Sequence, residues 1–293
     1  MSIVIGHDGS DSGDDGATLG AQLAHATGET PIIVAVYPEE NPIGAGRVDA
    51  EWVAYMRGQA EEVSEHARRF YEGRGVQAEF RVVGSSSAAH GLDDVAEAET
   101  ATMIVVGSSP RGARRRISPG STGERLLHGA ICPVAVAPRG LRERPADTPV
   151  RRIGVAYVDS PEAGEAVRVA TELAQETAAT LMLYTVVGPR AEVVAPVIGR
   201  DAELSFLASV REGARTALDA ALAALPEGVT ATAELLEGDV IDELASLDER
   251  EVDVLVMGSR GYGPVRRVLL GGVARKLIRR AACPLIVVPR GST

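Results

Sequence analysis

Residues 107–140 read GSSPRGARRRISPGSTGERLLHGAICPVAVAPRG, and residues 258–291 read GSRGYGPVRRVLLGGVARKLIRRAACPLIVVPRG. The two stretches align without a gap at a shift of 151 residues, and they are identical at 14 of 34 positions. The openings of the two halves also match, because IVIGHDGSDSG from Ile3 is similar to IGVAYVDSPEAG from Ile153. Self-similarity at a fixed spacing marks a repeated structural unit, so the chain is predicted to be a tandem duplication.

The duplication divides the 293 residues into two domains of similar size. We expect the first domain over residues 1–140 and the second over residues 150–291. The polar stretch between them, LRERPADTP at 141–149, has the composition of a linker.

Short apolar runs alternate with longer amphipathic stretches in both halves. Runs such as MIVVG and VLVMG are continuously apolar, which is typical of strands covered on both faces. This alternation, strand first, predicts an α/β fold with a five-stranded parallel, doubly wound sheet in each half, flanked by helices. The predicted strands are 3–6, 32–37, 80–83, 103–106 and 134–137, then 153–157, 181–187, 230–236, 254–257 and 285–288.

The last apolar run of each half, PVAVAP or PLIVVP, is expected to form a sheet edge. Because proteins rarely leave such edges exposed, we expect the two runs to pair across a pseudo-twofold axis. The chain would then be an intramolecular pseudo-dimer. Further association into a homodimer stays open at this point.

Composition excludes several classes of function. A net charge of −11 and a pI near 5.1 argue against nucleic-acid binding. The one lysine, Lys276, follows Arg275, so a GxxxxGK[ST] phosphate loop is absent from the sequence. No run approaches the ~20 apolar residues of a membrane span, and the first residues lack a basic leader region. We therefore expect a cytoplasmic protein with no membrane partner.

In doubly wound sheets, ligands bind at the carboxyl ends of the strands. The first predicted strand leads into Asp8-Gly9-Ser10, and the fourth leads into a glycine-rich loop that precedes a helix. Free backbone N–H groups in such a loop suit phosphate. Residues 107–123 and 254–293 contain several arginines and no acidic residue. These basic stretches favour a small phosphate-bearing ligand, although solvated helix faces or subunit contacts would explain individual arginines.

In these motifs the sequence resembles the universal stress protein family. Members carry the pattern G-x2-G-x9-G-[ST] after the fourth strand and an Asp after the first. The resemblance covers nearly the whole chain as two consecutive copies. It implies two Rossmann-like domains of the adenine nucleotide alpha hydrolase-like type, each with strand order 3-2-1-4-5. Members that keep the pattern look like ATP binders, and others lack it.

The resemblance implies a nucleotide site in each half, with a defect in each. The first half keeps Asp8 but has Pro110 in place of the second glycine, which removes a backbone donor. The second half keeps three glycines, but Gly272 replaces the hydroxyl residue and Val158 stands where Asp8 would be, beside Asp159. We rank the first half ahead. The implied nucleotide-binding residues are Asp8, Gly9, Ser10, Val36, Gly107, Pro110, Gly120, Ser121 and Thr122, then Asp159, Val186, Gly258, Gly261, Gly271, Gly272 and Val273.

We expect no metal site. The segment DGSDSGDDG, residues 8–16, superficially resembles a calcium loop, but position twelve is Leu19 rather than Glu. It is interpreted as a strand-to-helix turn with capping side chains. The histidines lack metal-ligand spacing: His7 is a candidate for contact with a ligand, whereas three others are expected on helices, facing solvent or packing partners: His25, His66 and His128.

The leading hypothesis is a regulatory protein of the stress response that binds an adenine nucleotide such as ATP or AMP, with or without Mg²⁺. Efficient catalysis is not expected, because the sequence has no GxSxG or HExxH motif and no evident general base for a γ-phosphate. Two alternatives stay open. In one, both sites are too degraded to bind nucleotide and the protein is an interaction module. In the other, it is a slow ATPase.

Overall fold

The computed structural model describes residues 1–39, 50–109, 115–188, 200–247, 251–259 and 271–289. Strands and helices alternate along both halves, as predicted. The first half contains β1 (Ser2–Gly6), α1 (Asp11–Thr27), β2 (Thr30–Pro38), α2 (Ala50–Glu72), β3 (Glu79–Ser85), α3 (Ala88–Ala98), β4 (Met103–Gly107), α4 (Ser121–Leu126) and β5 (Val134–Ala137). The second contains β6 (Arg152–Ala156), α5 (Pro161–Thr177), β7 (Thr180–Val187), α7 (Arg200–Ala223), β8 (Ala231–Glu237), α8 (Val240–Ser246), β9 (Val254–Gly258), α9 (Gly272–Leu277) and β10 (Leu285–Val288).

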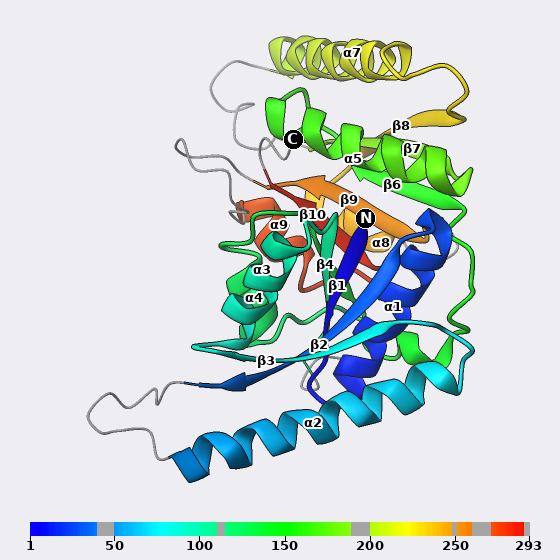
Figure 1. Ribbon diagram of the computed structural model, residues 1–293. Coiled ribbons are helices and arrows are strands. Elements are labelled where there is room, and N and C mark those ends of the chain that lie inside the picture. The colour runs from blue at the N-terminus through cyan, green and yellow to red at the C-terminus, as the bar shows by residue number, and fades with distance from the viewer. Residues whose placement is uncertain (40–49, 110–114, 189–199, 248–250, 260–270, 290–293) are drawn as a thin grey trace.

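All these strands form one ten-stranded sheet in the order β3-β2-β1-β4-β5-β10-β9-β6-β7-β8. Pairing within each half is parallel. At the centre, β5 and β10 pair antiparallel, with Leu285 opposite Val136 and Val287 opposite Val134. The two apolar edges expected from the sequence therefore cover each other. As a result, α2 and α7 lie at opposite ends of the molecule (Figure 1).

Two apolar cores, one on each face of the sheet, run through both halves. One core packs strand side chains against α3, α4, α8 and α9. The other packs them against α1, α2, α5 and α7. Aliphatic residues and alanine make up most of both cores, and each core holds one buried tyrosine, Tyr184 or Tyr71. The inner strands β1, β4, β5, β9 and β10 are thus covered on both faces, which explains their unbroken apolar runs, whereas the outermost strands β3 and β8 are partly exposed.

The helices that follow the first strand of each half begin in the same way. Ser10 caps α1 by accepting hydrogen bonds from the N–H groups of Ser12 and Gly13. Ser160 caps α5, accepts from Ala163 N–H, and precedes Pro161 at the first helical turn. Side-chain oxygens at these caps satisfy N–H groups that have no partner within the helix.

The connection between the halves lies against α1 rather than standing away from it. A 3₁₀ turn, η1 (Leu141–Glu143), opens it. The buried carboxylate of Asp15 accepts from the N–H groups of Gly140 and Arg142, both at 2.9 Å. Further along, Gln22 Nε2 donates to the Pro145 carbonyl at 3.0 Å. These bonds fix the path of a segment whose polar composition alone indicated only a linker.

Candidate functional site

A cavity of about 650 Å³ opens at the carboxyl ends of β1, β2 and β4. Gly6, Val36 and Gly107, from these three strands, line it. Its position is the one at which parallel α/β sheets bind their ligands. Six of the residues predicted for the first half lie on its wall: Asp8, Val36, Gly107, Gly120, Ser121 and Thr122.

The turn from β1 to α1 presents Asp8, which is exposed, at this cavity. Asp8 Oδ1 accepts hydrogen bonds from Ser10 N–H at 3.1 Å and from Ser10 Oγ at 2.5 Å. Gly9 between them has φ of +77°, a conformation that glycine adopts without steric cost. Gly9 and Ser10, both predicted site residues, therefore shape the turn that holds Asp8.

Gly107 ends β4 where α1 crosses it. A Cβ atom at Gly107 would lie 1.7 Å from the Ser12 carbonyl oxygen, so no other residue fits. In the second half, a Cβ at Gly258 would lie 2.3 Å from the Glu162 carbonyl oxygen. Both glycines thus have a packing reason to be glycine, which is independent of the ligand role implied by the resemblance.

Hydrogen bonds tie the start of the loop after β4 to α1, to β5 and to the end of the loop. Ser12 Oγ donates to the Ser108 carbonyl. Ser108 Oγ donates to the Ala137 carbonyl at 2.6 Å, and Ser109 N–H donates to the Ser118 carbonyl at 2.6 Å. The loop then reaches α4, where Gly120 is the N-cap and supplies no side-chain cap. Of the loop residues predicted for the site, Pro110 lies outside the described residues.

One wall of the cavity was missed by the sequence motifs. Met56, Gln59, Ala60 and Val63, all from α2, line it. Their spacing of three, one and three residues places them on one face of a helix. That periodicity is the signal that could have found them, but it does not reveal that this face meets the end of β1.

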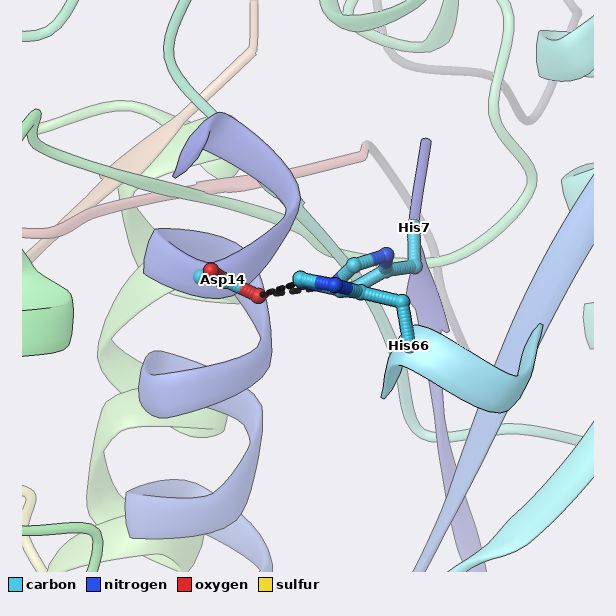
Figure 2. A group of neighbouring side chains, drawn as sticks. All are labelled: His7, Asp14 and His66. Atoms are coloured by element: carbon cyan, nitrogen blue, oxygen red, sulfur yellow. Dashed lines mark hydrogen bonds and ion pairs between the residues drawn. The ribbon is translucent and has the colours of Figure 1, made fainter. Parts of the chain in front are cut away.

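His7, Asp14 and His66 form a cluster next to the cavity, in which His7 and Asp14 are buried and His66 is partly exposed; His7 also lines the cavity (Figure 2). The Nε2 atoms of both histidines lie 3.1 Å from Asp14 Oδ1. Burial raises the pKa of the Asp14 carboxyl, but hydrogen bonds from His7 and His66 outweigh this and leave its pKa below the usual value. The sequence placed His66 on a helix facing solvent or packing partners; the structure joins it to Asp14, 52 residues away.

The second half has the same backbone frame with different side chains. Val158, 62% exposed, follows Tyr157 at the end of β6, and Asp159 next to it is exposed. Val186 packs against the core as Val36 does. Gly271 caps α9, which begins with Gly272 and the exposed Val273. Gly261 lies outside the described residues.

These features define a class: a doubly wound α/β protein with a cavity at the carboxyl ends of its strands. The model of the universal stress protein family matches residues 1–138 and again 149–289. The chain belongs to the universal stress protein family, with two consecutive copies of the family's domain. Among the described residues, no helix is long and apolar enough to cross a membrane.

Relatives with the same two-copy length exist. The chain is 28% identical over 295 residues to the universal stress protein Rv2319c of Mycobacterium tuberculosis, a match that covers 99% of this chain and 100% of the relative. The crystal structure of a universal stress protein from Archaeoglobus fulgidus matches with a TM-score of 0.68 at 22% identity, over 99% of this chain and 98% of that one. A structure from Pseudomonas aeruginosa matches with a TM-score of 0.61 at 17% identity, over 99% and 93%. At these identities the two structures show the fold alone.

Proposed function

We propose that the protein is a regulatory adenine-nucleotide-binding protein of the stress response, whose first half holds the nucleotide. The observation that carries the proposal is the convergence of Asp8, Val36, Gly107, Gly120 and Ser121 on one cavity. These residues come from separate segments of the chain. A volume of about 650 Å³ lies within the range of small-molecule sites.

The chemistry of the wall divides into three parts. Val36, Leu92 and Val106 offer an apolar surface to a base. The carboxylate of Asp8 is an acceptor for ribose hydroxyl groups. Backbone N–H groups and hydroxyls at Gly120 and after it are donors for phosphate oxygens. This division matches the three parts of a nucleotide.

Efficient hydrolysis is not part of the proposal. His7 is the histidine on the described cavity wall, and both of its ring nitrogens already have partners in Gly9 and Asp14. It is therefore not placed to activate a water molecule. We expect phosphate release from ATP to stay at background.

Calorimetry on the full chain with ATP, ADP, AMP and cyclic AMP, with and without Mg²⁺, tests the proposal. Replacement of Asp8 by the residue of the second half, Asp8→Val, removes hydrogen bonds to a charged group and should weaken binding about 10-fold to 100-fold. Asp159→Val is the matched control and should bind like the unchanged chain. An absence of heat with all four nucleotides would refute nucleotide binding and favour the interaction module.

A further inference from the structure

His7 makes two hydrogen bonds, one to Gly9 in the turn beside the cavity and one to Asp14 on α1. Its Nδ1 accepts from the Gly9 N–H at 3.0 Å, so this nitrogen carries no proton. A neutral ring then has its proton on Nε2, where it donates to Asp14 Oδ1 at 3.1 Å. The His7 side chain is fully buried and Asp14 nearly so. Figure 2 shows the two histidines reaching Asp14 from different elements.

A metal ion is the obvious alternative for two histidines and a carboxylate, since their ligand atoms lie within 4.8 Å of one another. A metal on His7 Nε2 would move the ring proton to Nδ1. That proton would then face the Gly9 N–H, which now donates to the same nitrogen. The hydrogen bonding at Gly9 therefore favours a chain of hydrogen bonds over a metal site. This chain, which joins Gly9 to His7, His7 to Asp14 and Asp14 to His66, is called the relay.

Each partner of Asp14 belongs to a different wall of the cavity. His7 holds the N–H of Gly9, which lies between Asp8 and Ser10 in the turn. His66 lies on α2, one turn after Val63, which lines the cavity. A Cβ at Gly9 would lie 3.1 Å from Val63 Cγ2, so α2 also packs on the turn itself. Asp14 thus links the turn, through His7, to α2, through His66.

We infer that His7, Asp14 and His66 are positioning residues of the nucleotide site, which hold the Asp8 turn and α2 in register. This inference rests on the proposed function. The second half supports it, because Tyr157 and Gly164 stand at the positions of His7 and Asp14 and cannot form the relay. That half also lacks a counterpart of Asp8. The relay and the side chain that it positions are lost together.

The relay requires a neutral His7, because a protonated ring cannot accept from Gly9. The ionisable groups placed against this ring are Asp14 on α1, His66 on α2 and Asp8 in the turn. A variant that keeps an acceptor for the Gly9 N–H but loses the bond to Asp14 separates the two hydrogen bonds of the ring.

His7→Asn is that variant. Its amide oxygen occupies the place of Nδ1 and accepts from the Gly9 N–H, but the bond to Asp14 is lost. His7→Ala loses both bonds and should bind ATP about tenfold more weakly, as should Asp14→Ala. His7→Asn should recover part of this loss, because it keeps the acceptor for the Gly9 N–H but not the bond to Asp14. His66→Ala should weaken binding about threefold, and His25→Ala, on the exposed end of α1, should change nothing.

The ring tautomer is an independent readout. Nitrogen-15 spectra should show His7 protonated at Nε2, and amide hydrogen exchange at Gly9 should be faster in His7→Ala than in His7→Asn. A proton on Nδ1, or ATP binding by folded His7→Ala at the unchanged affinity, overturns the relay. If the unchanged chain binds no ATP, the proposed function fails and the tautomer and Gly9 exchange alone decide the relay. If His7→Ala does not fold, His7→Asn and His66→Ala decide it.

Discussion

At the end of β1 the His7 N–H donates to the Val34 carbonyl, and at the end of β6 the Tyr157 N–H donates to the Tyr184 carbonyl. The backbone of the two halves is therefore equivalent at a position where their side chains differ. Strand pairing, a serine helix cap and a glycine under the first helix recur in both halves.

The side chains that face the cavity in the first half differ from those at the equivalent positions of the second half. Asp8 stands where the second half has Val158, and Gly13 stands where it has Ala163. The fold therefore depends on the positions that the two halves share, and the chemistry of the cavity wall depends on positions at which they differ. Substitutions that exchange residues between the halves can separate the two sets.

The largest expected effect concerns the shared glycines. Gly107→Ala should lower the free energy of unfolding by about 3 kcal/mol or more, because the new Cβ meets backbone that cannot move aside. Gly258→Ala should cost about 1 to 3 kcal/mol for the same reason. Urea unfolding measures both. Gly164→Ala, whose Cβ meets no atom within 4 Å inside α5, is the control and should stabilise by about 0.5 to 1 kcal/mol. Full stability of Gly107→Ala would contradict the packing role.

A smaller effect is expected where the halves differ. Gly13→Ala gives the first half the residue of the second, and its Cβ would lie 3.0 Å from Asp8 Oδ1 and from His7 Nδ1. The side chains of Asp8 and His7 must both give way to the new Cβ atom. ATP binding should therefore weaken about fivefold to tenfold while the protein stays folded. Calorimetry measures this against Ala163→Gly, which should leave affinity unchanged. Equal affinity in Gly13→Ala would show that the close approach is unimportant for binding.

The smallest expected effect is on how steeply the free energy of unfolding falls as the pH is lowered in acid. The pKa of Asp14 is lower in the folded chain than the unfolded value of about 3.9, so its ionised form stabilises the fold above that pH. This contribution is lost as the pH falls through the folded pKa. Stability should therefore decline less steeply below about pH 4 in Asp14→Asn than in the unchanged chain. Urea midpoints across this range test it, and parallel slopes would argue against an ionised Asp14. The second half has Gly164 here and contributes nothing comparable.

The repeat and the apolar runs predicted the fold class and the positions of the strands, because buried parallel strands leave a strong signal. The pairing of β5 with β10 followed from the cost of exposed edges. Asp8 and Gly120 could be predicted for the site, since strand ends and helix starts are local features.

The remaining parts of the site depend on tertiary contacts. Met56 and Gln59 line the cavity only because α2 packs on β2 and β3 and its Val63 meets the turn after β1 at Gly9, and no local pattern encodes that approach. The bond from His66 to Asp14 joins residues 52 positions apart. Gly107 matched a ligand motif, yet the proximity of the Ser12 carbonyl explains it without a ligand.

The central pairing of β5 with β10 also sets an order of events during synthesis. The partner of Val136 is Leu285, so the apolar edge of the first half leaves the ribosome about 150 residues before its cover. At typical elongation rates this is about 8 to 30 seconds, during which a folded first half presents β5 unpaired. A nascent chain of this protein is therefore exposed to pairing with other nascent chains until its last strand is made.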